Sequence, residues 1–394
     1  MGENAPIVGK VETFVDPAPF HLEAQGLTLG FYPAGADRLA QLLHMIGQAR
    51  VSLKLAFYIF DCDDSGALVR DALADAARRG VAVTLILDGF GALADAQFLS
   101  PLLAAGGQYR RFQARWSRRY LIRNHQKIVI ADGALAMLGG FNIADSYFAP
   151  PANDGWTDLA FTVQGPVVAR IEAWFTQLED WTTLDLAQFR ALRRSVRDWN
   201  SGRGPVQLLI GGPGRGLSSW AQAVGHDLIH GNKLDMMMAY FAPSAHLLRR
   251  MHKIAKKGET RLLLPGRSDN GATIGASRLL YSGLLDAGAQ IFEFQPCKLH
   301  TKLIVLDDVV YLGSANFDMR SLYLNLEIML RIEDAALATR MRSFIAHHLA
   351  AAEAITPQLH KSRASWFNRL RWMGSWLLVA VIDYTVSRRL NLGL

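Results

Sequence analysis

Two segments that lie far apart in the sequence carry the same pattern of chemically active residues. One segment, HQKIVIAD, begins at His125, and the other, HTKLIVLD, begins at His300. In each, a lysine follows the histidine by two residues, an apolar run comes next, and an aspartate ends the run. Two chance copies of so specific a pattern are improbable, so we interpret them as an internal duplication that brings the same chemistry to one site twice.

The residue types in and after these segments suit the binding of one phosphate group. Residues two apart on a β-strand point to the same side, so each histidine is expected to share a side with its lysine. Small residues in the following turn let the backbone approach a ligand closely, and asparagines there supply amide donors. The predicted pocket is formed by His125, Lys127, Asn142, His300, Lys302, Ser314 and Asn316.

Asp132 and Asp307 complete the repeated pattern and are counted with its catalytic residues. Both follow an apolar run at the point where a turn begins. We therefore expect them to act structurally, by capping turns or by pairing with basic groups.

Two further carboxylates are candidates for orienting the histidines. Asp158 follows His125 by 33 residues, and Glu327 follows His300 by 27 residues. Both lie in apolar, strand-like stretches, where a carboxylate without a partner would be costly. Each histidine needs an orienting group on its second ring nitrogen, and we expect these acids to serve the histidine that each one follows. The alternative is an ordinary surface carboxylate on an edge strand.

The elements around the two segments are also duplicated. Residues 51–60 and 81–89 have the pattern of buried strands, and residues 66–80 between them have the pattern of an amphipathic helix. The same order returns at residues 233–266. Alternating strands and helices predict a sheet of parallel type flanked by helices in each half. Two such halves, packed about a pseudo-twofold axis, would bring the two histidine segments face to face.

A stretch rich in glycine and proline marks the expected boundary between the halves. It lies near Ser201. We therefore expect an N-terminal half at residues 1–200, a C-terminal half at 201–360, and a separate aromatic and basic tail at 361–394.

The paired motifs resemble those of the phospholipase D superfamily. Finer details resemble its bacterial cardiolipin synthase branch, namely the segments LDGFG, GGFNIADSY, WTDLAFTVQGPVV, LLPGRSD and GSANFDMRSLYLNLE. The resemblance implies an α/β fold of two pseudo-twofold-related halves, each a mixed β-sheet flanked by helices, with the active site at their interface. It also implies that His125 forms a phosphohistidine, and that His300 acts first as the acid and then as the base.

The same resemblance implies a phosphatidyltransferase that transfers a phosphatidyl group between phosphatidylglycerol molecules and releases glycerol. Lysines and asparagines would supply the charge stabilisation that metal ions supply in other phosphoryl-transfer enzymes, so no cofactor and no metal are expected. A phospholipid hydrolase would use the same residues and remains an alternative. A nuclease of the same superfamily is another, because residues 110–124 hold six arginines and no acid. A pseudoenzyme is disfavoured, since all six His, Lys and Asn positions are intact.

Charge and the C-terminal tail favour a lipid partner. The net charge of +7 suits a polyanion, either nucleic acid or an anionic membrane surface. The tail surrounds an 11-residue apolar run, Trp372 to Ile382, with tryptophans and arginines. This run is shorter than the roughly 20 residues of a spanning helix, so we expect it to lie among lipid headgroups. The alternative is a helix docked on the core. Aromatic residues among the arginines of 110–124 also suit a membrane, and no nucleic-acid partner is expected.

The expected location is the cytoplasmic face of the cell membrane, with peripheral attachment. Cys62 and Cys297 are the only cysteines, which excludes a disulfide scaffold and favours a reducing compartment. The first residues show no secretory signal and none of the membrane helices of longer synthases. We expect a complete active site within one monomer.

Overall fold

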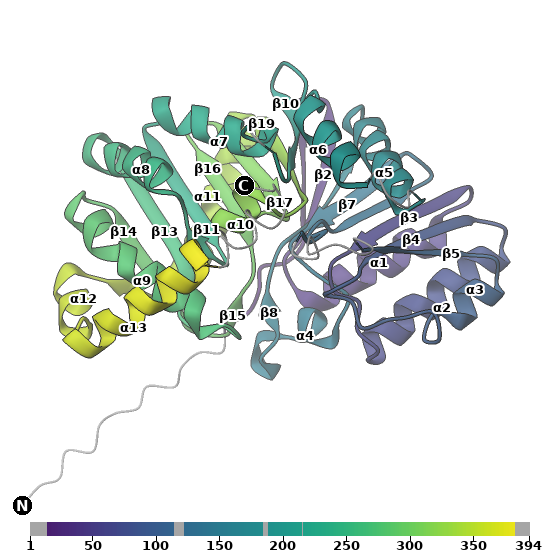
Figure 1. The fold of residues 1–394 in the computed structure, drawn as a ribbon, viewed down its shortest axis with the longest axis horizontal. Helices are drawn as coiled ribbons and strands as arrows, with labels where there is room; N and C mark the ends of the chain where they lie inside the picture. Colours follow the sequence, from purple (N-terminus) through teal and green to yellow (C-terminus); the bar gives the residue numbers. More distant parts are fainter. Residues whose placement is uncertain (1–13, 114–121, 184–187, 215, 383–394) are drawn as a thin grey trace, which may run out of the picture.

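The computed structural model describes residues 14–113, 122–183, 188–214 and 216–382 (Figure 1). The predictions for the N-terminus, for most of the arginine-rich segment before His125 and for the end of the tail fall outside these ranges. In the described part, two mixed eight-stranded sheets stand side by side with helices packed against them (Figure 1). The predicted α/β fold with two halves is confirmed.

The first sheet has the strand order β1-β2-β9-β7-β6-β3-β4-β5. Its strands are β1 (Phe20–Ala24), β2 (Leu27–Tyr32), β3 (Ser52–Phe57), β4 (Ala82–Asp88), β5 (Gln108–Phe112), β6 (Ile128–Ala131), β7 (Leu135–Gly139) and β9 (Ala160–Gln164). The helices of this half are α1 (Gly35–Gln48), α2 (Asp64–Arg78), α3 (Ser100–Ala104), α4 (Asp145–Phe148), the 3₁₀ helix η1 (Pro151–Asn153), α5 (Val167–Thr183) and α6 (Gln188–Asp198).

The second sheet has the order β10-β19-β17-β16-β11-β13-β14-β20. Its strands are β10 (Val206–Gly211), β11 (Lys233–Met238), β13 (Glu259–Pro265), β14 (Gln290–Phe294), β16 (Lys302–Leu306), β17 (Val309–Gly313), β19 (Glu327–Glu333) and β20 (Ala352–Ile355). The helices are α7 (Ser219–His230), α8 (Ala245–Lys257), α9 (Gly271–Asp286), α10 (Met319–Tyr323) and α11 (Ala335–Leu349). Short strands form two more ladders: β12 (Phe241–Ala242) with β18 (Phe317–Asp318), and β8 (Trp156–Thr157) with β15 (Lys298–Leu299).

The two sheets repeat one strand order, which confirms the duplication. The run β9-β7-β6-β3-β4-β5 corresponds strand for strand to β19-β17-β16-β11-β13-β14. Within the described residues of the two eight-stranded sheets, pairing is parallel only within β3-β4-β5 and β11-β13-β14, where a helix crosses between successive strands. The expectation of a parallel-type sheet is therefore correct only in part. The motif segments fold into the antiparallel hairpins β6-β7 and β16-β17, which were not expected.

The two halves share one continuous hydrophobic core. It contains buried residues of α5, among them Trp174 and Phe175, and of α11, among them Met341 and Phe344, with inward-facing residues of both sheets. Each half has a second core between its sheet and its outer helices. Because the shared core joins both sheets, groups at their interface are held by both halves at once.

The C-terminal helices lie on the outside of the second half. α12 (Pro357–Arg363) leads into α13 (Trp366–Trp376) and a π-helix, η2 (Leu377–Ile382), and α13 packs along α9 (Figure 1). Trp372 is 3% exposed, and a Cβ at Gly275 of α9 would lie 2.5 Å from Ser375 Oγ. One face of α13 is therefore docked closely on the protein. Within the described residues, no helix combines the length and apolarity that a bilayer crossing requires.

Candidate active site

Each motif histidine lies in an extended segment that leads into its hairpin. His125 and Lys127 precede β6, which begins at Ile128, and His300 precedes β16, which begins at Lys302. The expectation that each histidine–lysine pair sits within a strand is therefore wrong. The histidines lie outside the sheet ladders because their backbone partners belong to the opposite half.

Backbone hydrogen bonds join each histidine segment to that opposite half. The N–H of His125 donates to the carbonyl of Leu326 at 3.0 Å, and the N–H of Leu326 donates to the carbonyl of Arg123 at 2.9 Å. The N–H of His300 donates to the carbonyl of Thr157 at 2.8 Å, beside the parallel pairing of β15 with β8. In both cases the acceptor residue immediately precedes a buried carboxylate.

These bridges pair each histidine with the acid of the other half. His125 Nδ1 lies 3.1 and 3.0 Å from the two carboxylate oxygens of Glu327. His300 Nδ1 lies 2.8 Å from Asp158 Oδ2, and both carboxylates are 0% exposed. The expected acids are present, but the expectation that each serves the histidine of its own half is wrong. Separation along the chain could not reveal this exchange, which arises because the two halves bridge crosswise.

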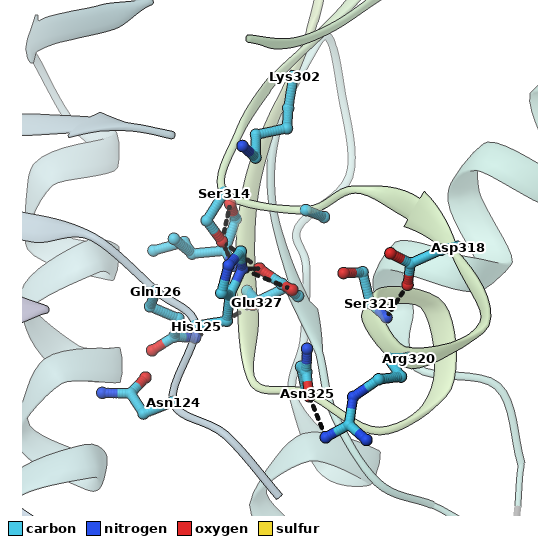
Figure 2. A network of polar contacts seen from close by, with 12 residues as sticks. Asn124, His125, Gln126, Lys302, Ser314, Asp318, Arg320, Ser321, Asn325 and Glu327 are labelled. Carbon is cyan, nitrogen blue, oxygen red and sulfur yellow. Dashed lines mark hydrogen bonds and ion pairs between the residues drawn. The ribbon is translucent and has the colours of Figure 1, made fainter. Parts of the chain in front are cut away.

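Ser314 supports a carboxylate and does not line the cavity that holds the histidines. Its hydroxyl donates to Glu327 Oε2 at 2.5 Å (Figure 2). Its predicted role in binding phosphate is therefore corrected. The corresponding position in the first half is Gly140, where a Cβ would lie 2.5 Å from Asp158 Oδ1. That oxygen instead accepts the N–H of Leu159 at 2.7 Å, so the two carboxylates are held in different ways.

Lys127 and Lys302 are buried directly behind their histidines, 0% and 3% exposed. Lys127 Nζ donates to the carbonyl of His125 at 2.7 Å, and Lys302 Nζ donates to that of His300 at 2.5 Å. Burial lowers the pKa of Lys127 to about 7 and that of Lys302 to about 8, although neighbouring carboxylates oppose the shift. An anion in the cavity would stabilise both charged forms.

Asp132 and Asp307 stand at the far ends of the hairpins and do not line the cavity. Both adopt positive φ, 54° and 49°. Their carboxylates accept backbone N–H groups at the start of a neighbouring strand, those of Arg50, Val51 and Ser52 and those of Asn232 and Lys233 respectively. These carboxylates tie turns to the sheets, which corrects the expectation that Asp132 and Asp307 are catalytic.

One cavity of about 500 Å³ contains both histidines. It is lined by Tyr58, Ile59, Phe90, Arg123, His125, Asn142, Tyr147, Tyr240, Asp269, Asn270, His300, Asn316, Asp318, Arg320, Ser321 and Asn325. The structure therefore brings together residues from both halves, as the duplication predicted.

The predicted asparagines lie in this cavity and differ in their partners. Asn142 Oδ1 accepts the N–H of Ile59 at 3.1 Å. Asn316 is 3% exposed, and within the described part of the chain its Oδ1 has no hydrogen-bond partner. A buried amide oxygen that accepts no hydrogen bond is costly unless a ligand supplies the donor. Asn316 is therefore suited to contact a bound substrate.

The surroundings of both imidazoles favour the neutral form. Burial lowers the pKa of His300 to about 3 and that of His125 well below its ordinary value, and the neighbouring lysines act in the same direction. Burial also raises the pKa of Glu327. At Asp158 burial acts in the same direction, but the interactions with His300, Lys302 and Arg38 together outweigh it, so the pKa is lowered. A neutral imidazole whose Nδ1–H donates a hydrogen bond to a carboxylate presents the lone pair of Nε2. Each histidine can thus act as nucleophile or base at the cavity.

A fully buried arginine of α1 organises the surroundings of His300. Arg38 is 0% exposed, and its guanidinium donates to the carbonyls of Asp158 at 2.8 Å, Tyr147 at 2.7 Å and Trp156 at 3.0 Å. The rings of Tyr147 and Trp156 contact the His300 ring edge-on, with centroids 5.1 and 5.2 Å apart. One side chain therefore positions all three residues around this imidazole.

Several of these residues were not predicted from the sequence. Arg38 had a usable signal, because it occupies the apolar stripe of its helix with Leu42, Met45 and Ile46, where a charge requires partners. Arg320 lies inside a segment that was noted only for its resemblance. Tyr58, whose ring centroid lies 5.1 Å from that of His125, had no distinguishing signal in its apolar segment.

The geometry defines a class of site. Two histidines with buried carboxylate partners and two asparagines line one cavity, and two lysines are buried behind the histidines. This arrangement suits a phosphodiester held between a nucleophile and an acid. Comparison with known proteins agrees. Residues 42–179 and 228–349 match the family model described as "Cardiolipin synthase, PLD-like domain". The chain belongs to this family, which confirms the predicted relation to the phospholipase D superfamily.

Individual relatives are bacterial synthases. The chain is 31% identical to "Cardiolipin synthase 1" of Bacillus cereus, over 75% of this chain and 61% of that protein. It is 29% identical to "Cardiolipin synthase A" of Pseudomonas fluorescens, over 84% of this chain and 70% of that protein. The chain thus spans less than two thirds of the Bacillus cereus relative.

Solved structures share the fold at low sequence identity. Phosphatidylserine synthase of Haemophilus influenzae superposes with a TM-score of 0.71 at 12% identity, over 92% of this chain and 97% of that one. Polyphosphate kinase of Porphyromonas gingivalis gives 0.58 at 13% identity, over 85% and 49%. These similarities establish the arrangement of the two halves.

Proposed function

We propose that this chain is a phosphatidyltransferase of the cardiolipin synthase type. It would transfer a phosphatidyl group from one phosphatidylglycerol to a hydroxyl of another and release glycerol. The observation that carries the proposal is the crosswise pairing of His125 with Glu327 and of His300 with Asp158 at one cavity. Family membership supports the choice of a phosphatidyl substrate.

In the first step, His125 Nε2 attacks phosphorus and the bond to the glycerol oxygen breaks. His300 donates a proton to that oxygen, and glycerol leaves. Because burial lowers the pKa of His300 to about 3, this proton is taken up when the anionic diester binds and stabilises the imidazolium. The charges of Lys127 and Lys302 and the amides of the asparagines stabilise the non-bridging oxygens.

In the second step, the incoming hydroxyl gives its proton to His300, and its oxygen attacks the phosphohistidine. The bond between phosphorus and His125 breaks, which restores the neutral imidazole and yields the product diester. Glu327 and Asp158 fix each ring by accepting a hydrogen bond from Nδ1–H throughout. The buried histidines have the same carboxylate partners in both steps, so their roles reverse without a rearrangement of the site.

A product assay tests the proposal against hydrolysis and nuclease activity. Purified protein is incubated with phosphatidylglycerol vesicles, and lipids and water-soluble products are quantified by mass spectrometry. Cardiolipin and glycerol in equal amounts are expected. Phosphatidic acid as the sole lipid product would instead identify a hydrolase. Cleavage of DNA or RNA with no lipid turnover would identify a nuclease.

We further propose that α13 attaches the protein to the cytoplasmic face of the membrane. One face of this helix carries large apolar side chains that are 52–75% exposed, namely Trp366, Phe367, Leu370 and Met373. Arg369 and Arg371 flank them, so the surface suits anionic lipid. The chain would thus consist of two halves, 1–200 and 201–360, followed by a membrane-contacting tail at 361–394. The active site would be complete within one monomer.

Replacing Trp366, Phe367 and Leu370 together by serine is expected to weaken binding to anionic vesicles at least about tenfold. Each exposed apolar side chain contributes roughly 1.5–3 kcal/mol when it is buried in lipid. Vesicle sedimentation measures the effect. The control replaces Leu68 and Ile229, which are 48% and 50% exposed elsewhere, by serine. Equal sedimentation of all three proteins would place the membrane contact outside α13.

A further inference from the structure

The cavity carries opposite charges beside its two histidines. Arg320 interacts electrostatically with His125, and also with Arg123, which precedes His125 by two residues. Asp269 interacts electrostatically with Lys302, the lysine that follows His300. At the end near His125, Arg123 and Arg320 outnumber the carboxylate of Asp318, which interacts electrostatically with Arg320, so this end is net cationic. The end near His300 contains the carboxylate of Asp269.

The position of Asp269 is defined by its neighbours. It lies between β13 and α9, and its carboxylate accepts hydrogen bonds from the hydroxyls of Tyr240 at 3.2 Å and Ser268 at 3.1 Å. Asn270, the next residue, caps α9 by accepting the N–H of Ala272 at 3.1 Å. Tyr240, Asp269 and Asn270 all line the cavity together with both histidines.

A carboxylate beside a site for an anionic diester repels the phosphate. It is favourable only if the part of the substrate next to it is neutral or cationic and donates hydrogen bonds. Hydrogen bonds from hydroxyls to a carboxylate are among the strong ones, because the acceptor is charged. The free hydroxyls of a glycerol headgroup meet this requirement.

We propose that Tyr240, Asp269 and Asn270 form a subsite for a hydroxyl-bearing headgroup. This inference rests on the proposed transferase function and adds a location for the alcohol. Asp269 accepts hydrogen bonds from the glycerol that leaves, and later from the glycerol of the incoming lipid. The phosphate lies toward the cationic end and the alcohol toward His300. This orientation places His300 beside the leaving oxygen and His125 on the opposite side of phosphorus. It therefore supports His300 as the acid and His125 as the nucleophile, independently of the resemblance to the phospholipase D superfamily.

Substrate preference tests the subsite. The full chain and its Asp269→Ala variant are compared on phosphatidylglycerol and on phosphatidylethanol, whose headgroup has no free hydroxyl, in identical mixed micelles. The measured quantity is kcat/KM for release of glycerol or ethanol. The ratio of the two values is expected to fall at least about tenfold in the variant, because hydrogen bonds to charged groups are worth about that factor. Tyr240→Phe should lower the ratio in the same direction by less.

The control is Asp286→Ala, which removes an exposed carboxylate from the end of α9 that is not at the cavity. It should leave the ratio unchanged. If Asp269→Ala lowers kcat/KM equally for both lipids, the residue is structural and the subsite is refuted. If the unaltered protein releases ethanol but no glycerol, the proposed phosphatidylglycerol function fails. The two failures are thus distinguishable.

Discussion

His125→Ala is expected to abolish transfer from every phosphodiester, natural or activated, by about 10⁴-fold or more. The reason is that His125 supplies the covalent intermediate, so an easier leaving group cannot replace it. His300→Ala is expected to behave differently. General acid catalysis is worth roughly 10²–10⁴-fold, and a nitrophenolate leaving group needs little of it. This variant should therefore lose activity on phosphatidylglycerol but retain most of its nitrophenol burst with a nitrophenyl phosphodiester.

The measurement compares burst amplitude and steady-state rate for both variants on both substrates. His226→Ala, which removes an exposed imidazole of α7, serves as the control and should behave like the unaltered protein. A burst in His125→Ala that is absent in His300→Ala would reverse the two roles. Loss of the burst in both variants on the activated substrate would remove support for separate roles.

Neutralising the two buried acids is expected to show that they work across the halves. Asp158→Asn should resemble His300→Ala and be rescued by the activated substrate. Glu327→Gln should resemble His125→Ala and should not be rescued. Loss of the orienting carboxylate costs on the order of 10³–10⁴-fold in comparable histidine–carboxylate pairs, because the imidazole then adopts the wrong tautomer or orientation.

Double-mutant cycles give the decisive measurement. Asp158→Asn should add little to His300→Ala, and Glu327→Gln should add little to His125→Ala. The opposite combinations should be closer to additive. Coupling of Asp158 with His125 instead would contradict the crosswise arrangement. Circular dichroism on each variant distinguishes a chemical effect from unfolding, since both carboxylates are fully buried.

The sequence predicted the duplicated fold and most of the groups at the site, but not how those groups are paired. Strand order and motif chemistry are encoded locally, in apolar periodicity and in the spacing of His, Lys and Asn. The pairing of His125 with Glu327 depends on a backbone bridge between Arg123 and Leu326, residues from different halves. No local pattern records such a contact.

The error about Ser314 has the same kind of cause. Ser314 follows a glycine in the same way as Gly140, which suggested an equivalent role at the phosphate. Its hydroxyl instead donates to Glu327. The pairing of Glu327 with His125 depends on contacts between the two halves, which the sequence does not show. Asp132 was correctly expected to be structural in the argument from its turn position, although the motif placed it among catalytic residues.

Because of the crosswise bridges, one half alone cannot form a complete histidine–carboxylate pair. A single half would hold a histidine with no acid behind it and an acid with no histidine before it, so it could work only after pairing with a second copy. Joining both copies in one chain removes the dependence on concentration. It also frees each copy to change alone, and the pairs Glu327 with Ser314 and Asp158 with Gly140 record that divergence. The duplication supplied both histidine–carboxylate pairs, and the differences between the halves let His125 act as the nucleophile and His300 as the acid and base.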